Sequence, residues 1–338
     1  MTAPSARILT VILNYRTAEM TLRAARAART AMEGIEGAIT IVDNDSQDGS
    51  FERLVQATAD WPGVRVLASD RNGGFGAGNN LGIRAGLPGG ARPDFIYLLN
   101  SDAFPEPEAI RLLRDHLLVQ PDCAFVGGAA FGEDGAPHVT AFRFPTAFSE
   151  FEGAANTGLI SRALRRHRLL VGMPETRCPV DWCAGATIMF RNDALDRTGL
   201  FDEDFFLYFE ETDLCHRIWA AGFTGCFLPQ SRVTHIGSAS TGAQSWRRVP
   251  DYWFESRARY FHKRGGALYL IWVTLAHFAG ATIWRTRMVI ERKEDRVTPH
   301  FLRDLTRQTW RFLKLGGTGA RAQRAAPARE GTERRWTS

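Results

Sequence analysis

Asp94-Phe95-Ile96-Tyr97-Leu98-Leu99-Asn100-Ser101-Asp102 is the stretch that decides the fold class of this 338-residue chain. Its run of large apolar residues without polar alternation is typical of a strand buried on both faces, as in a parallel sheet covered by helices. In open α/β sheets the ligand crevice lies at the carboxyl ends of the strands. Asp102 therefore stands where a binding site is expected, although an aspartate at a strand-to-helix turn can also be a simple helix cap.

The same unit of apolar strand, polar loop and helix occurs four times in roughly the first hundred residues. Strands are predicted at 8–13, 38–42, 64–67 and 95–99, and each is followed by a polar or glycine-rich loop. Alternating strands and helices are the signature of a doubly wound parallel sheet. The four loops are expected to open on the same rim of that sheet.

Composition and charge limit which kinds of protein this chain can be. Apolar residues make up 44% of the chain, and its five cysteines stand apart without zinc-site spacing. We therefore expect a large core and reduced thiols in a cytosolic protein, with no signal sequence at the amino end. The net charge of +5 is concentrated between Arg162 and Arg168 and after Arg247. This distribution suits an anionic lipid surface, whereas no nucleic-acid partner is expected because an RNA-binding signature of arginine and aromatic residues is missing.

Three parts are expected along the chain. A catalytic domain at 1–240 is followed by a helical, membrane-associating region at 241–312 and a basic disordered tail at 313–338. Within the first part, residues 145–179 have no clear period and predict a loop-rich insert. The apolar stretch 268–284 has basic flanks and is short for a spanning helix, which favours a helix lying in an anionic leaflet. The alternative is a buried helix that packs on the sheet or at the interface of a homodimer.

A series of motifs, taken in order and spacing, resembles one known family. The chain is similar to inverting glycosyltransferases of family 2 with the nucleotide-sugar-binding fold called GT-A, and within them to the rhamnosyltransferase-like branch. The likeness covers some 70% of the chain, roughly from Ile8 to Ser240. It is carried by Asn14-Tyr15, Val42-Asp43-Asn44-Asp45-Ser46, Asn72-Gly73-Gly74-Phe75-Gly76-Ala77-Gly78-Asn79, Leu99-Asn100-Ser101-Asp102, Gly199-Leu200-Phe201-Asp202-Glu203, Phe205-Phe206, Glu210-Glu211-Thr212-Asp213-Leu214, and His235 with Ser238.

This resemblance implies a fold and an activity. The fold is α/β of the GT-A type, a Rossmann-like, mostly parallel sheet flanked by helices, with a C-terminal helical extension. The activity is transfer of a sugar, rhamnose or similar, from a UDP- or dTDP-sugar to a hydroxyl of a glycan or polyprenyl-linked acceptor in cell-envelope polysaccharide synthesis. The enzyme would be cytoplasmic and peripheral at the inner face of the plasma membrane. Trp246-Arg247-Arg248 does not form the Gln-x-x-Arg-Trp motif of processive relatives, so one sugar per encounter is expected.

A divalent metal cofactor, Mg²⁺ or Mn²⁺, is part of what the resemblance implies. The departing diphosphate carries clustered negative charge, which such an ion neutralises. Asp102 would bind the ion directly, with His235 as a second protein ligand, and a histidine beside oxygen ligands favours Mn²⁺. The usual motif has two aspartates, whereas this chain offers Asn100 first, so metal affinity without nucleotide is expected to be weak. On its own, His235 could equally be a structural residue at a strand end.

The resemblance also implies where the substrates bind. Asp43 would accept from the N3–H of uracil or thymine, and Asn14 and Tyr15 would line the base pocket. The glycine-rich loop would approach the diphosphate and sugar, because glycines let backbone N–H groups come close. The full set of expected substrate-binding residues is Asn14, Tyr15, Asp43, Asp45, Arg71, Asn72, Gly74, Asn79, Asn100, Ser101, Trp182 and Gly185.

Glu211 is the candidate general base. The acceptor hydroxyl must lose a proton as it attacks the anomeric carbon opposite the leaving diphosphate, and one carboxylate within reach suffices. The family usually has aspartate at this second position of the acidic pair. Because glutamate is longer, Glu210 stays open as the alternative base.

Two other classes of function are weighed against this one. Gly76-Ala77-Gly78 with Gly82 resembles a dinucleotide fingerprint, which would indicate an NAD(P)-dependent oxidoreductase. Those glycines follow the third strand rather than the first, and the acidic pair would then have no role. A non-catalytic module that binds a glycan or lipid is the third interpretation, and the intact Glu210-Glu211 pair speaks against it.

Overall fold

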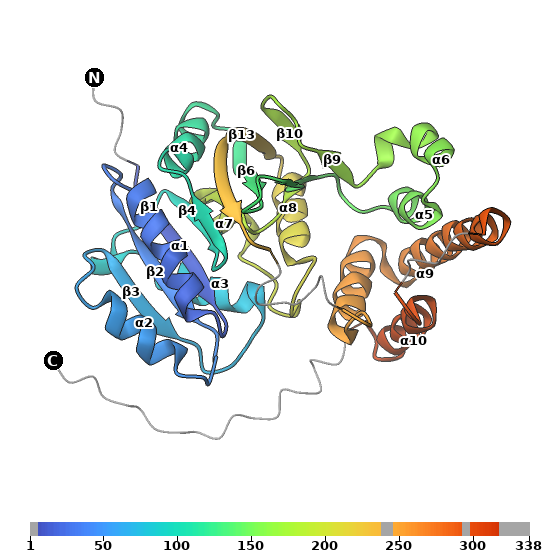
Figure 1. Cartoon of the computed structure of the whole chain (residues 1–338), viewed down its shortest axis with the longest axis horizontal. Helices are drawn as coiled ribbons and strands as arrows, with labels where there is room; N and C mark the ends of the chain where they lie inside the picture. Colours follow the sequence, from blue (N-terminus) through green and yellow to red (C-terminus); the bar gives the residue numbers. More distant parts are fainter. Residues whose placement is uncertain (1–5, 238–245, 293–297, 318–338) are drawn as a thin grey trace.

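A mixed, mostly parallel sheet forms the body of the molecule in the computed structural model, which describes residues 6–237, 246–292 and 298–317. The strand order is β10-β13-β6-β12-β4-β1-β2-β3, with β5 paired to β13 and β7 to β6 (Figure 1). The four predicted strands are confirmed as the parallel neighbours β1 (Ile8–Asn14), β2 (Gly37–Asp43), β3 (Val64–Ala68) and β4 (Phe95–Asn100). The others are β5 (Ala103–Pro105), β6 (Cys123–Phe131), β7 (Pro137–His138), β10 (Cys178–Val180), β12 (Thr187–Arg191) and β13 (Thr224–His235).

Strand β4 is buried on both faces, as its continuous apolar run predicted. Phe95, Tyr97 and Leu99 belong to the hydrophobic core on one face of the sheet, and Ile96 and Leu98 belong to the core on the other. Each of these side chains is at most 2% exposed. Full burial of one large apolar side chain contributes about 1.5–3 kcal/mol to the stability of the fold. Strand β4 therefore stabilises the cores on both faces of the sheet.

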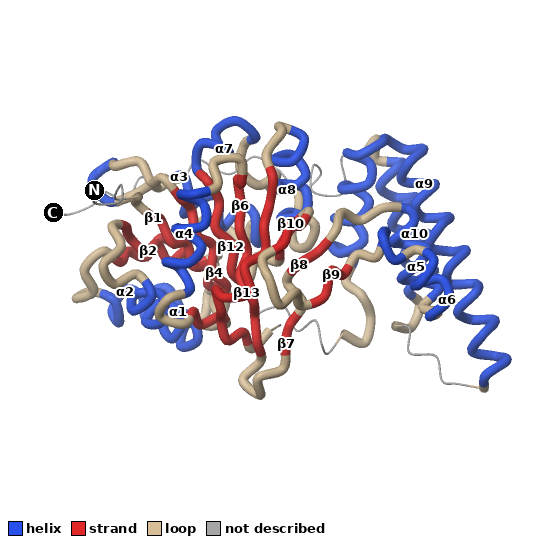
Figure 2. The backbone as a smooth tube through the Cα atoms, turned by 90° about the horizontal axis from the view of Figure 1, so that it is seen from above, coloured by secondary structure: helices blue, strands red, loops and turns tan. Residues whose placement is uncertain are grey.

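Helices cover both faces of the sheet (Figure 2). Residues of α1 (Ala18–Ala31), α2 (Ser50–Thr58) and α4 (Ala109–Val119) pack into the core that contains Tyr97. Residues of α3 (Phe75–Arg84), α7 (Asn192–Thr198) and α8 (Glu210–Ala220) pack into the other core. The loops after β1, β2, β3 and β4 open on one rim, because the four strands are parallel and in register.

The segment 145–179 is more regular than the sequence predicted. It contains α5 (Ala147–Ala155), α6 (Gly158–Ala163) and β9 (Leu170–Gly172), and β9 pairs with β8 (Ala141–Phe142), which pairs with β11 (Trp182–Cys183). Thr146 caps α5 by accepting from the Ser149 backbone N–H. The helix packs along the C-terminal helix α9. Such short helices depend on tertiary packing, which explains the missing period in the sequence.

The C-terminal region is helical, as expected. It consists of α9 (Asp251–Glu291), which is kinked at Gly265 and Gly266, and α10 (Phe301–Lys314). Both helices and α5 lie beyond the β10 end of the sheet, on the side opposite β3 (Figures 1 and 2). Helix α9 is long and apolar enough to cross a membrane by length and composition alone. The tail was expected from residue 313, whereas α10 continues to Lys314; residues 318–338 lie outside the described residues.

Candidate active site

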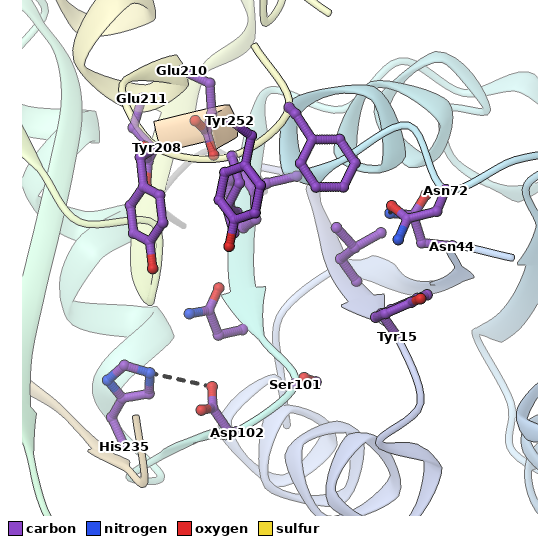
Figure 3. Close-up of a pocket in the computed structure, with 15 residues that line it drawn as sticks. Tyr15, Asn44, Asn72, Ser101, Asp102, Tyr208, Glu210, Glu211, His235 and Tyr252 are labelled. Carbon is purple, nitrogen blue, oxygen red and sulfur yellow. Dashed lines mark hydrogen bonds and ion pairs between the residues drawn. The ribbon is translucent and has the colours of Figure 1, made fainter. Parts of the chain in front are cut away.

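A pocket of about 470 Å³ opens at the carboxyl ends of the parallel strands, between their loops and the start of α8 and α9 (Figure 3). It brings together many of the expected residues from distant parts of the sequence. The expected residues that line it are Tyr15, Asn72, Asn100, Ser101, Asp102, Glu210, Glu211 and His235. Residues that the sequence analysis did not select also line it, namely Leu13, Asn44, Phe75, Phe206, Leu207, Tyr208 and Tyr252.

Asp102 and His235 are neighbours at one end of this pocket. Asp102 follows β4 and precedes β5, and β5 pairs with β13 so that Ala103 lies opposite His235. His235 Nε2 lies 3.2 Å from Asp102 Oδ1. This nitrogen is buried, and its contact to the carboxylate does not have hydrogen-bond geometry. The sheet register therefore aims a carboxylate oxygen and an imidazole nitrogen at one another (Figure 3).

The donor set of this pair suits a divalent cation that completes its coordination with phosphate oxygens. Mg²⁺ and Mn²⁺ are commonly held by one or two protein carboxylates plus substrate phosphates, and an imidazole suits Mn²⁺. Among the described residues, no group of three or more His, Cys, Asp or Glu side chains could hold a metal without such a ligand. The residues present therefore fit an ion that binds together with a diphosphate.

Glu210 and Glu211 begin α8 at the other end of the pocket (Figure 3). Glu210 is only 1% exposed, and its Oε2 has no hydrogen-bond partner among the described residues. Glu211 is half-buried, and its Oε1 accepts from the Gly185 backbone N–H at 3.3 Å. Gly185 permits this approach, because a Cβ there would lie 3.1 Å from the same oxygen and 2.7 Å from the ring of Phe75.

Burial raises the pKa of both glutamates. The pKa of Glu210 lies well above its usual value because of burial and the neighbouring charge of Glu211. Burial also raises the pKa of Glu211, but backbone N–H groups, including that of Gly185, oppose the rise. Because Glu211 is less buried and accepts from the Gly185 N–H, it is the better placed of the two to carry the negative charge, and burial beside that charge favours the neutral form of Glu210. A half-buried carboxylate with a raised pKa that faces a pocket is suited to accept a proton.

The side of the pocket formed by Tyr15, Asn44 and Asn72 is held by amide hydrogen bonds (Figure 3). Asn44 Nδ2 donates to Asn72 Oδ1 at 2.9 Å and to the Gly74 carbonyl at 3.3 Å. Gly74 has φ +86°, and a Cβ there would lie 1.8 Å from the Phe206 carbonyl oxygen. Gly74 thus shapes this wall without lining it. Asn44 directly follows Asp43 in the motif Val42-Asp43-Asn44-Asp45-Ser46, and this position could have identified Asn44 as a residue of the pocket.

Asn14 and Asp43 do not line the pocket but form a buried network beneath it. Asn14 Nδ2 and Ser46 Oγ each donate to Asp43 Oδ1 at 2.6 Å. Thr21 Oγ1 donates to Asn14 Oδ1 at 2.7 Å. These bonds tie the loops after β1 and β2 together. In this conformation the network positions the loops that form the edge of the pocket. Contact of Asp43 with the uracil or thymine of the donor stays a prediction.

The remaining expected residues lie outside the pocket lining. Trp182 stacks on Phe142 with ring centroids 4.1 Å apart and donates from Nε1 to the Arg143 carbonyl, so it belongs to the small sheet. Asn79 Nδ2 donates to the Phe75 carbonyl within α3. Asp45 and Arg71 lie on the rim loops, and any contact of theirs with substrate stays a prediction.

The glycines of α3 serve helix packing. A Cβ on Gly78 would lie 2.3 Å from Leu13 Cδ1, and one on Gly82 would lie 2.6 Å from Val11 Cγ1. They let α3 lie close to β1. Because the glycines face the core in this way, their dinucleotide-like spacing is no evidence for an oxidoreductase.

The chain is similar to known glycosyltransferases. It is 30% identical over 220 residues to the N-acetylglucosaminyl-diphospho-decaprenol L-rhamnosyltransferase of Mycobacterium tuberculosis, covering 60% of this chain and 68% of that protein. It is 25% identical over 213 residues to the low-salt glycan biosynthesis hexosyltransferase Agl10 of Haloferax volcanii, covering 61% of this chain and 60% of that protein.

A solved structure has the same fold. The mannosyltransferase PcManGT from Pyrobaculum calidifontis, in complex with GDP-Man and Mn²⁺, superimposes with a TM-score of 0.55 at 13% identity, covering 93% of this chain and 80% of that one. This likeness confirms the predicted GT-A architecture with its mostly parallel sheet. Residues 6–250 match the family described as Glycosyltransferase like family 2. The oxidoreductase interpretation is therefore wrong, and the chain belongs to glycosyltransferase family 2.

Proposed function

We propose that this glycosyltransferase inverts configuration as it moves rhamnose, or a similar sugar, from a dTDP- or UDP-sugar to a hydroxyl of a glycan or polyprenyl-linked acceptor in cell-envelope polysaccharide synthesis. One observation carries the proposal: Glu211 and the Asp102–His235 pair line opposite ends of one pocket (Figure 3). Inversion needs a base on one face of the sugar and a site for the leaving group on the other. The name of the mycobacterial relative supports rhamnose and a polyprenyl diphosphate acceptor.

In this mechanism Glu211 takes the proton of the acceptor hydroxyl. The hydroxyl oxygen then forms a bond to the anomeric carbon, the bond from that carbon to the diphosphate oxygen breaks, and the electron pair leaves with the diphosphate. Glu210 stays protonated and adds no second negative charge beside the base. Asp102 and His235 would hold a divalent cation, which when bound neutralises charge on the departing diphosphate.

The donor is expected to lie with its base toward Tyr15, Asn44 and Asn72. These residues lie on the far side of the pocket from Glu211 (Figure 3). They offer an aromatic face and amide groups, which recognise a neutral base by stacking and hydrogen bonds. The diphosphate would then reach Asp102, and the sugar would lie between Asp102 and Glu211.

A nucleotide-sugar panel tests the proposed function. We expect dTDP-L-rhamnose or a UDP-sugar with Mn²⁺ to raise the melting temperature and to be consumed with an octyl β-N-acetylglucosaminide acceptor. The product linkage, read by NMR, should be of opposite anomeric configuration to the donor. Retention of configuration, or no turnover of any donor in the panel, would contradict the proposal.

We further propose that the enzyme is peripheral at the inner face of the plasma membrane. The support is an apolar stripe on α9 that faces solvent, made of Leu268, Ile271, Trp272 and Leu275. Leu268 is 82% exposed and Trp272 58%. The chain has no acidic residue between Glu255 and Glu291. Contiguous exposed apolar residues within a basic segment suit an anionic bilayer.

The opposite face of α9 supports a helix that lies along the bilayer rather than across it. His277 Nδ1 lies 3.0 Å from Glu150 Oε2 on α5, and Arg257 Nη2 donates to the same oxygen at 2.7 Å. Burial alone would raise the pKa of Glu150, but Arg257 and His277 lower it to about 2, so the carboxylate is ionised. A spanning helix would expose this charged cluster to hydrocarbon, which is costly.

The double variant Leu268→Gln, Trp272→Gln tests this surface. We expect it to fold normally and to bind phosphatidylglycerol-containing vesicles about tenfold less than the wild type in co-sedimentation, because two inserting side chains are lost. Val119→Gln removes an apolar side chain that is 69% exposed on α4 and is the matched control. If the double variant binds vesicles as the wild type does, or if only its oligomeric state changes, α9 is not the membrane surface.

A further inference from the structure

Aromatic side chains form one wall of the active-site pocket beside Glu210 and Glu211. Tyr208 and Tyr252 line the pocket, and their rings are parallel within 11° with centroids 6.5 Å apart. Trp246 meets both rings edge-on, at 5.8 Å from Tyr208 and 6.2 Å from Tyr252. Phe206 packs on Tyr252 at 5.4 Å. We call Tyr208, Trp246 and Tyr252 the aromatic wall.

The backbone that presents this wall is strained. Tyr208 and Phe209 have φ values of +69° and +68°, a left-handed conformation that bulky side chains rarely adopt. Two such residues in succession persist only where surrounding contacts hold them. Here Ser256 Oγ of α9 donates to the Leu207 carbonyl at 3.0 Å, and Phe209 packs against Tyr260 with centroids 5.6 Å apart. Helix α9 therefore holds Leu207 and Phe209, the residues on either side of Tyr208, and with them the start of α8 at Glu210 and Glu211.

The position and chemistry of the wall distinguish it from the donor side. Its two residues that line the pocket, Tyr208 and Tyr252, lie toward Glu210 and Glu211 and away from Tyr15, Asn44 and Asn72 (Figure 3). Burial and the nearby Tyr208 raise the pKa of Tyr252 to about 12, so the wall is uncharged at neutral pH. A neutral aromatic surface is unsuited to a diphosphate but suits the C–H face of a sugar ring, with the phenol groups as polar contacts.

We propose that the aromatic wall is the acceptor subsite, where the sugar ring that carries the attacking hydroxyl packs against Tyr252 and Tyr208 next to Glu211. The inference rests on the proposed function. Tyr252 reaches the pocket from α9, and Tyr208 reaches it from the loop that leads into Glu210 and Glu211.

Steady-state kinetics with dTDP-L-rhamnose, or whichever donor of the panel is used, and octyl β-N-acetylglucosaminide test the proposal. We expect Tyr252→Ala to raise the acceptor KM about tenfold while the donor KM and acceptor-free donor hydrolysis stay within about twofold. Tyr252→Phe keeps the ring and should retain a near-normal acceptor KM. Trp219→Ala removes an aromatic side chain that is 59% exposed on α8 and is the control.

The outcomes separate the two proposals. If the wild type neither transfers nor hydrolyses any donor, the proposed function fails. If the wild type transfers sugar but Tyr252→Ala leaves the acceptor KM unchanged, or raises the donor KM instead, the acceptor subsite is wrong while the function stands. If Tyr252→Phe raises the acceptor KM as much as Tyr252→Ala does, a contact of the Tyr252 hydroxyl rather than packing of its ring binds the acceptor, and the proposal is overturned as stated.

Discussion

Glu211→Gln is expected to reduce sugar transfer by roughly 10²- to 10⁴-fold, the range that a positioned general base contributes. The amide is nearly the same size and can still lie against the Gly185 N–H region, but it cannot accept the acceptor proton. Donor binding should change little, because the residue lies away from the Tyr15 side of the pocket. Initial rates measured beside the donor dissociation constant check both parts. Undiminished transfer would exclude Glu211 as the base.

Glu210→Gln is the matched control for this prediction. Because its raised pKa keeps Glu210 protonated, the glutamine reproduces its neutral state, and transfer should stay within about fivefold of the wild type. The proton held by Glu210 in the folded state also has a consequence for stability. When folding raises the pKa of a carboxyl, the free energy of unfolding falls as the pH rises above the pKa that the group has in the unfolded chain. Glu210→Gln removes this titration, so the free energy of unfolding of the variant should depend less on pH over that range. If Glu210→Gln is the inactive variant, the roles of the two residues are reversed.

The pH profile gives the same assignment independently. The base must be ionised, so kcat/KM should rise with pH and level off above the pKa of Glu211, which burial raises above the usual value for a glutamate. The rising limb should therefore lie at higher pH than for an exposed glutamate. In Glu211→Gln this limb should disappear from the residual activity.

Asp102→Asn is expected to abolish most of the benefit of Mn²⁺, with a fall in transfer of roughly 10- to 100-fold or more. The amide keeps the shape but removes the negative charge that would hold the ion beside His235. Calorimetry should show wild-type affinity for UDP or dTDP rising with Mn²⁺, and the variant should lose that rise. Such a readout does not depend on turnover.

Asp94→Asn is the control for the metal prediction. Asp94 stands at the opposite end of β4, where its carboxylate accepts from the Arg7 backbone N–H at 2.7 Å. Its exchange should leave the Mn²⁺ dependence intact. Equal Mn²⁺ enhancement in Asp102→Asn and the wild type would show that the ion, if used, is held elsewhere.

The sheet was predictable because its strands carry local signals. β4 has an unbroken apolar run from Phe95 to Leu99, so both faces of the sheet had to be covered, and a ligand-binding rim followed from the parallel strands. Asp102 was identified because a carboxylate follows a buried strand, and Glu210 and Glu211 because their motif resembles the acidic pair of a known family. These features depend on neighbouring residues along the chain.

The contacts across the fold were not predictable from the sequence. At the end of β2, the motif gives no sign that Asp43 is satisfied by Asn14 and Ser46 while Asn44 reaches the pocket. Trp182 was expected to bind substrate, yet its stacking partner Phe142 places it in the small sheet. Tyr252 lies in the region set apart as a separate helical unit, and only the packing of α9 on the loop at 206–209 brings it to the site.

The kink of α9 separates the part that reaches the pocket from the part that carries the apolar stripe. Gly266 has φ +70° and permits this change of direction. At about 1.5 Å per residue, the path from Tyr252 to Leu268 measures about 24 Å. With the stripe bound to lipid, this one rigid segment would hold the pocket at a fixed position relative to the membrane surface. An acceptor anchored in the same membrane would then meet Glu211 without a separate carrier.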